Sequence, residues 1–160
     1  MTNIEAAKLE DVGLILTMIK ELAEWEGYID QVDASEELLS ESLFGKSAIA
    51  KTLIASIDNR PVGYLIYCPK FTTYTGRNEI YLQDVYLREE ARGGGVGIAL
   101  RSELANIAIA SNATRIEWFV DESNTMALSF YEQLGANIID AIKVVRLSGA
   151  NLSSVARNKR

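Results

Sequence analysis

A cluster of glycines in the middle of the chain has the composition of a phosphate-binding loop. Four glycines stand within the five residues after Arg92, in the order Gly93, Gly94, Gly95, Val96 and Gly97. Glycine has no Cβ atom, so the backbone amides of such a loop can approach a ligand closely. The next residues have a helical pattern, and a helix N-terminus presents unpaired N–H groups with a partial positive charge. With the guanidinium of Arg92 alongside, the loop predicts a phosphate or pyrophosphate ligand; a glycine-rich surface turn is the alternative.

Two common phosphate-binding motifs do not fit these residues. A P-loop requires Gly-x-x-x-x-Gly-Lys-Ser/Thr, and no lysine follows the glycines. A dinucleotide fingerprint requires Gly-x-Gly-x-x-Gly, and counting from Gly93 its third glycine falls on Ile98. The predicted site therefore belongs to another class of phosphate-binding loop.

The supply of catalytic side chains is restricted. The chain has no histidine and one cysteine, Cys68, which excludes Ser-His-Asp triads, Cys-His pairs, thiolate clusters and His-ligated metals. Cys68 ends the apolar run GYLIYC and is expected to be a small core residue and not a nucleophile. Proton transfer is left to Asp, Glu, Tyr, Lys or water, and no metal is expected.

Hydrophobic spacing predicts the helices that surround the loop. Residues 11–26 form an amphipathic helix with Asp11 as its N-cap, and residues 33–45 form a shorter one. In the second helix Asp33 and Glu36 resemble a capping box, and Gly45 is the stop. Two further helices are expected after Gly95 and over residues 125–136, and the polar, basic tail is helical in part.

Alternating apolar residues predict the strands, over residues 3–6, 48–57, 61–68, 78–87, 114–120 and 137–147. In the strand 78–87, alternation places Tyr81, Gln83, Val85 and Leu87 on one face and Leu82, Asp84 and Tyr86 on the other. The order β-α-α-β-β-β-α-β-α-β implies an α/β fold, a mixed sheet covered by helices, in one domain over residues 1–160.

The chain resembles the GCN5-related N-acetyltransferase (GNAT) superfamily. Residues 92–97 match its Arg/Gln-x-x-Gly-x-Gly/Ala signature, after a strand and at the start of a helix. The segments IKELAEWE, YLQDVYL, SNTMALSFYEQLGA and VRLSGANL are similar to the spermidine/spermine (diamine) and thialysine acetyltransferase branch. The resemblance implies a mostly antiparallel mixed sheet with helices on both faces and a V-shaped splay between two parallel strands.

The resemblance also implies acetyl-CoA as cosubstrate, bound in that splay. Its pyrophosphate would lie on the loop from Arg92 to Gly97, and its pantetheine arm would pair with the backbone of Val85, Tyr86 and Leu87. Tyr131 matches the tyrosine that donates a proton to the departing thiolate, a sensible transfer because phenols and thiols have comparable pKa values, ~10 and ~8.5. Asn124 matches an asparagine that contacts CoA. The alternatives are a tyrosine packed on the sheet and a simple helix N-cap.

The acceptor site departs from the branch pattern. The branch commonly has Leu-Glu-Asp where this chain has Leu82-Gln83-Asp84, and glutamine cannot take a proton. Asp84 is therefore the expected start of a proton relay, and Glu26 matches another acidic position of the acceptor site. Trp25 and Tyr74 are aromatic candidates to hold the amine. Each of these residues has a plainer interpretation as solvated surface or loop.

The expected reaction is acetyl transfer to a primary amine of a small molecule: a diamine, polyamine or amino-acid-like amine. Acetylation of a peptide or protein amine and a non-catalytic CoA sensor are the alternatives. A formal net charge of -6 argues against nucleic acid, and no apolar run reaches the ~20 residues of a membrane span. A cytoplasmic location is expected, and the resemblance implies a homodimer, although the C-terminal VVRLSGANL also suits a closed monomer.

Overall fold

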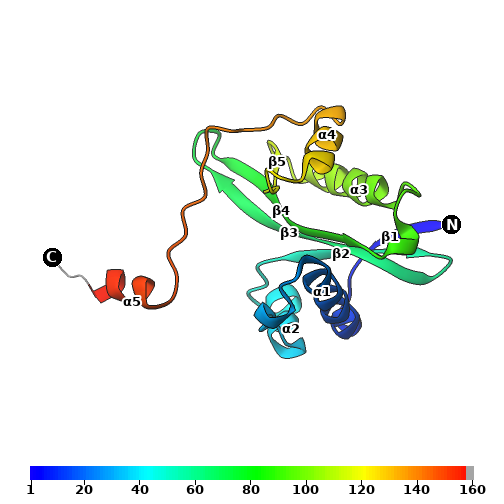
Figure 1. Cartoon of the computed structure of the whole chain (residues 1–160), viewed down its shortest axis with the longest axis horizontal. Helices are drawn as coiled ribbons and strands as arrows, with labels where there is room; N and C mark the ends of the chain where they lie inside the picture. Colours follow the sequence, from blue (N-terminus) through cyan, green and yellow to red (C-terminus); the bar gives the residue numbers. More distant parts are fainter. Residues whose placement is uncertain (158–160) are drawn as a thin grey trace. The chain divides into compact units, whose positions relative to one another are not determined.

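The computed structural model describes residues 1–157 and contains a five-stranded sheet with helices on both faces (Figure 1). Contacts divide the chain into two compact units, Met1–Trp118 and Phe119–Arg160, and the single-domain organisation stays a prediction. The α-helices and strands of the first unit are β1 (Thr2–Ala6), α1 (Val12–Glu26), α2 (Glu36–Phe44), β2 (Lys51–Ile57), β3 (Arg60–Thr72), β4 (Arg77–Leu87), α3 (Val96–Ala110) and β5 (Ile116–Glu117). Short 3-10 turns occupy Leu9–Asp11, Ile29–Gln31 and Glu89–Ala91.

The strands lie in chain order, β1-β2-β3-β4-β5. All neighbours are antiparallel except β4 and β5, which are parallel. The predicted turn between β2 and β3 is present, and Asp58 and Asn59 both have positive φ (49° and 63°). Two such residues make the hairpin turn whose twist suits antiparallel strands. The predicted mixed sheet is confirmed.

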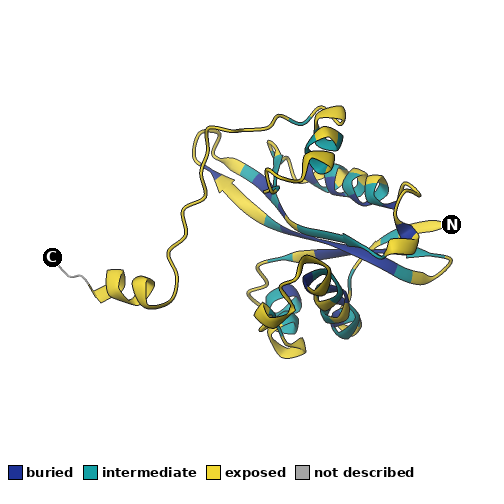
Figure 2. Ribbon diagram, viewed as in Figure 1, coloured by how far each residue is buried: buried dark blue, intermediate teal, exposed yellow. Residues whose placement is uncertain are grey.

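Apolar residues fill the space on both sides of the sheet, and burial concentrates in its central strands (Figure 2). On one face Leu65 of β3 and Leu82 of β4 pack with Leu100 and Leu104 of α3. On the other face a second cluster combines β3 with α1 and α2; its buried members are Ile15, Met18, Leu43, Ile54, Tyr64 and Ile66. The alternation of β3 thus sends successive side chains into two separate cores.

A β-bulge interrupts the predicted alternation of β4. Ile66 pairs with Asp84 but the next residue, Tyr67, pairs with Leu82, so Gln83 has no partner on β3. An extra residue reverses the facing of everything beyond it. Leu82 therefore shares the α3 face with Val85 and Leu87, and its predicted place with Asp84 and Tyr86 is wrong.

Of the two helix N-caps predicted for the first unit, Asp11 is confirmed in position and the capping box at Asp33 is wrong. The N-cap of α2 is Ser35, whose Oγ accepts a hydrogen bond from the Leu38 amide at 3.2 Å, in place of the predicted Asp33 box. Asp11 stands at the N-cap of α1, but its carboxylate accepts from the Lys8 amide at 2.7 Å and closes the preceding turn. The predicted stop at Gly45 is confirmed.

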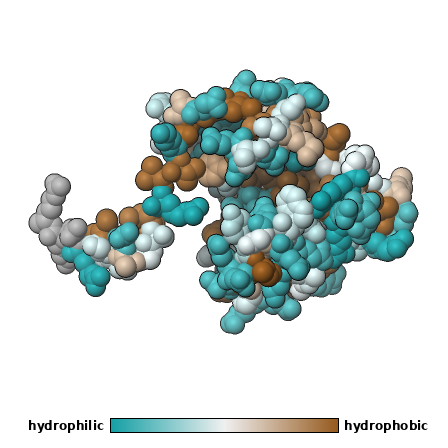
Figure 3. Space-filling model, viewed as in Figure 1, coloured by the Kyte–Doolittle hydropathy of each residue, from teal (hydrophilic) through white to brown (hydrophobic). Residues whose placement is uncertain are grey.

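The second unit contains α4 (Thr125–Gln133) and α5 (Gly149–Arg157). Gly135 adopts a left-handed φ of 82° just after α4, as its predicted stop requires. The strand predicted over residues 137–147 is wrong, because this segment has neither helix nor strand. A strand needs a neighbour to complete its hydrogen bonds. Its apolar side chains are exposed, and Figure 3 shows hydrophobic side chains along the segment leading to α5; they are Ile138, Ile139, Ile142, Val144, Val145 and Leu147.

No helix within residues 1–157 is both long and apolar enough to cross a membrane.

Candidate active site

The glycine loop presents a row of backbone amides at the start of α3. Gly93 and Gly95 have positive φ (74° and 81°), a conformation in which a side chain would be strained, and Gly95 is the N-cap. The first bond into α3 runs from the Ala99 amide to the Gly95 carbonyl at 2.9 Å. The amides of Val96, Gly97 and Ile98 therefore have no acceptor within the helix. This arrangement suits an anion such as a pyrophosphate.

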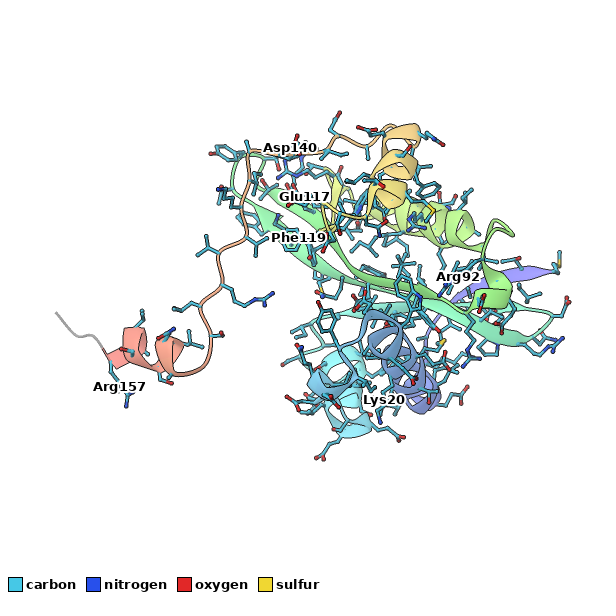
Figure 4. The ribbon with its side chains drawn as sticks, viewed as in Figure 1. Lys20, Arg92, Glu117, Phe119, Asp140 and Arg157 are labelled. Atoms are coloured by element: carbon cyan, nitrogen blue, oxygen red, sulfur yellow. The ribbon has the colours of Figure 1, made fainter. Side chains whose placement is uncertain are left out.

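Arg92 connects this loop to β4 and α1. Its Nε donates to the Leu87 carbonyl at 3.0 Å, and its guanidinium carbon lies 5.3 Å from the centre of the Trp25 ring. Figure 4 shows Arg92 beyond the end of β4 at which the glycine loop begins, far along the sheet from Glu117 of β5. The structure thus brings together a residue predicted to bind the cosubstrate and one predicted to bind the amine.

The sheet opens beside this loop. β4 and β5 pair only at Ile80 with Ile116 and at Tyr81 with Glu117. Within the described residues, the rest of β4 has no strand on its β5 side, so backbone N–H and C=O groups between Leu82 and Tyr86 can meet a ligand there, while the Leu87 carbonyl accepts from Arg92. A peptide-like pantetheine arm can satisfy such groups. The open edge and the loop amides together fit acetyl-CoA.

A glycine of β3 allows close packing at the end of β4. A Cβ atom on Gly63 would lie 2.4 Å from the Tyr86 carbonyl oxygen, which a side chain could not do without a shift of the backbone. Gly63 was not among the predicted site residues, although a lone glycine inside a strand is a signal for close backbone approach. This contact holds β4 close to β3 where the open edge ends.

Two acidic residues, Glu26 of α1 and Asp84 of β4, are near enough to interact electrostatically. Asp84 is half-buried, and burial raises the pKa of its carboxyl. Glu26, the last residue of α1, is more exposed; partial burial and then the charge of Asp84 raise its pKa. Neither has an ion-pair partner among residues 1–157. The two predicted acidic residues therefore share one site, which would favour a cation.

Two of the other predicted acceptor residues adjoin this pair in the chain, and the third lies far from it. Gln83 is exposed on the bulge, and Trp25 lies beneath Arg92 with 66% of its surface exposed. Tyr74 is 98% exposed at the tip of the β3–β4 hairpin. At ~3.3 Å per residue, the run of β4 from Arg77 to Asp84 separates that tip from the carboxylates by roughly 23 Å.

An ion pair that the sequence did not indicate ties α1 to the end of β4. Arg88 binds Glu21 through two hydrogen bonds, Nε–Oε2 at 3.0 Å and Nη2–Oε1 at 2.7 Å, and donates to the Pro61 carbonyl at 3.1 Å. The hydrogen bond from Arg88 lowers the pKa of Glu21. Bidentate pairing orients both partners, so it holds α1 and hence Glu26 in place.

Cys68 lies half-buried on β3, and burial raises the pKa of its thiol, which disfavours the nucleophilic thiolate.

In the second unit, Asn124 is the N-cap of α4, and its Oδ1 accepts from the Ala127 amide at 3.1 Å. Tyr131 lies on α4 with its ring 5.6 Å from that of Phe130. The functional roles of Asn124 and Tyr131 stay predictions.

Comparison with known proteins decides the family. The model of the acetyltransferase (GNAT) family matches residues 16–136. The chain belongs to this family. As a GNAT protein it is similar to a thialysine N-epsilon-acetyltransferase from Bos taurus, with 38% identity over 141 residues that cover 83% of this chain and 82% of the relative. It is also similar to an L-ornithine N5-acetyltransferase from Arabidopsis thaliana, with 30% identity over 58% of this chain and 41% of the relative.

A solved structure supports the GNAT fold. An integron cassette protein from the mobile metagenome of V. cholerae superposes with a TM-score of 0.82 and 26% identity, over 98% of both chains. The predicted family, fold class and acyltransferase activity are confirmed.

Proposed function

We propose that this GNAT enzyme transfers the acetyl group of acetyl-CoA to a primary amine of a small molecule by direct attack. The observation that carries the proposal is the Glu26–Asp84 pair, which lacks a cationic partner within residues 1–157. A substrate ammonium group would supply that partner. The relatives named for thialysine and L-ornithine support an amino-acid-like amine, and a diamine or polyamine offers the same chemistry.

The cosubstrate would be held by backbone more than by side chains. The loop amides from Gly93 to Gly97, with Arg92, would bind the pyrophosphate, and Val85, Tyr86 and Leu87 would pair with the pantetheine arm. Bound acetyl-CoA supplies an activated thioester. Arg92 would have to release the Leu87 carbonyl for that oxygen to pair with another donor.

Proton transfer would be shared between the two acidic residues and Tyr131. An alkyl amine is protonated at neutral pH, so Asp84 must take one proton, directly or through water, before nitrogen can attack. Gln83 cannot perform this role. The carbon–sulfur bond would break as the C–N bond forms, and Tyr131 would give a proton to the departing sulfur while Asn124 contacts CoA. The second proton of the attacking nitrogen leaves as the amide forms and, through solvent, restores the Tyr131 hydroxyl. Trp25 and Tyr74 are proposed to contact the amine.

A panel of amines tests this function through release of the free thiol from acetyl-CoA. The panel contains thialysine, ornithine, lysine, putrescine, spermidine and a basic peptide. We expect turnover with at least one small amine, and a rise in melting temperature with acetyl-CoA but not with ATP or NAD. Turnover of the peptide alone would favour a protein acetyltransferase. A stabilising effect of acetyl-CoA without any turnover would favour a CoA sensor.

We further propose a cytoplasmic homodimer. The exposed apolar segment of residues 138–147 supports self-association, since large exposed apolar runs mark interaction surfaces. The lone Cys68 suits a reducing compartment because it offers no intrachain disulfide.

A further inference from the structure

The hydroxyl group of Tyr64 is buried without a partner. Tyr64 lies on β3 with 0% of its surface exposed, and its ring lies 6.1 Å from that of Tyr86. Within residues 1–157 no protein atom forms a hydrogen bond with its Oη. A buried hydroxyl without a partner is unfavourable, so such groups usually bind ordered water.

The strand register places Tyr64 and Asp84 as neighbours on one face of the sheet. Tyr64 is directly opposite Tyr86, and Ile66 is directly opposite Asp84. Tyr64 and Asp84 are therefore diagonal neighbours on the sheet face that α1 covers, at a separation of roughly 7–8 Å that an aromatic side chain can span. The Tyr64 hydroxyl has no direct hydrogen bond to Asp84, so its own need for a partner can be met by a water molecule.

We propose that Tyr64 Oη and the Asp84 carboxylate hold one ordered water between them, and that this water is the first acceptor of the substrate amine's proton. The proposal rests on the amine acetyltransferase function given above. Tyr64 is a positioning residue here: it donates a hydrogen bond to the water and keeps its own proton.

One relayed transfer accounts for every proton in this step. The ammonium group gives a proton to the water as the water gives one of its own to Asp84. The amine is left neutral with its lone pair, the carboxylate becomes a carboxylic acid, and the water is regenerated. Transfer through one water is within the reach expected of a general base.

The charges around Tyr64 agree with this role. Burial and then the carboxylates of Asp84 and Glu26 raise the pKa of Tyr64 far above its ordinary value, so its hydroxyl remains a donor at any working pH. The neighbouring titratable groups are Cys68 on β3, Tyr81 and Tyr86 on β4, and Glu21 on α1, which is paired with Arg88.

The test compares Tyr64→Phe with Tyr67→Phe. Tyr67 is a buried β3 tyrosine of the opposite, α3-facing core, so its variant removes the same hydroxyl away from the site. Removing the donor and its water from Asp84 makes the carboxylate harder to ionise. We expect Tyr64→Phe to raise the apparent pKa on the acid limb of kcat/KM by about one pH unit. We also expect it to lower kcat/KM at neutral pH by about tenfold. Tyr67→Phe should leave both quantities unchanged.

A second readout separates this inference from the proposed function. Carbon NMR of labelled aspartate follows the ionisation of Asp84 without any substrate, with Asp84→Asn used to assign the signal. A raised Asp84 pKa in Tyr64→Phe alone would support the bridging water even if no amine in the panel is acetylated. An unmoved Asp84 pKa, in a variant that still binds acetyl-CoA, would overturn the proposal.

Discussion

Asp84, the proposed base, is the residue at which catalysis and stability would oppose each other. Burial raises its folded-state pKa above the unfolded value, so the folded chain binds this proton more tightly than the unfolded chain does. The destabilisation is absent at pH values below the unfolded pKa, ~3.9, and develops as the pH rises through the raised folded value. A half-buried carboxylate that lacks a cationic partner among residues 1–157 thus lowers stability at neutral pH, although it supplies the proposed base.

We therefore expect Asp84→Asn to lower turnover at least ~100-fold, as for loss of a general base. At pH 8 the same variant should melt ~2–4 °C higher than the parent, and the gap should close toward pH 4. Thiol-release kinetics and thermal melts over that pH range measure both effects. Asp30→Asn, at an exposed aspartate, is the matched control and should change neither. A melting temperature of Asp84→Asn that falls at pH 8 would contradict this argument.

Some neighbours in the candidate site could be predicted from sequence motifs, and others depend on how the strands pair. The motif match placed Asp84 and Glu26 in one acceptor site, and the structure brings them together. No residue type or spacing indicates the bulge at Gln83, because a bulge is set by the register against β3. The neighbourhood of Tyr64 and Asp84 follows from that same register, so residue types alone could not reveal it.

At the scale of elements, Gly63 controls how closely β3 approaches the functional end of β4. A Cβ atom there would lie 2.4 Å from the Tyr86 carbonyl oxygen, so the backbone of one strand must shift. We expect Gly63→Ala to destabilise the fold by about 1–3 kcal/mol, as overpacking does. We also expect several-fold weaker binding of acetyl-CoA, because the displaced residues carry the open edge. Thermal melts and calorimetric titration with acetyl-CoA measure the two effects.

Gly13→Ala is the matched control for this variant. Gly13 lies within α1, and an added Cβ would meet only the flexible end of Glu36 at 3.3 Å. Alanine is favoured over glycine inside a helix by up to ~1 kcal/mol, so this variant should be neutral or stabilising. Equal stability and equal acetyl-CoA affinity of the two variants would contradict the role given to Gly63.

Most elements could be predicted because each has a local cause. The α1 pattern, the Asp58–Asn59 turn and the Gly45 stop depend on neighbouring residues, and all three are confirmed. The strand predicted over residues 137–147 had the same apolar alternation but is not formed. An alternating apolar pattern is necessary for a strand but not sufficient. The strand also needs a neighbouring strand for its backbone hydrogen bonds, and the pattern does not show which segment would provide it.

At the scale of the whole molecule, that same segment bears on assembly. Within it Ile142 is 69% exposed and Val145 is 92% exposed. Apolar, extended backbone with unpaired N–H and C=O groups favours pairing with another chain. Most soluble homo-oligomers are symmetric dimers, in which one segment can meet its own copy. A symmetric dimer formed through this segment would bury these apolar side chains from both copies of the chain.

We therefore expect sedimentation velocity at micromolar concentration to give twice the 17.7 kDa mass of one chain. Val145→Asp should shift the population to monomers, because burying an unpaired carboxylate at an apolar interface is unfavourable. Lys143→Glu reverses a charge in the same segment without adding a charge to an apolar position, and this control should remain dimeric. A parent chain that sediments as a monomer would refute the dimer, and a dimer that survives Val145→Asp would move its interface away from this segment.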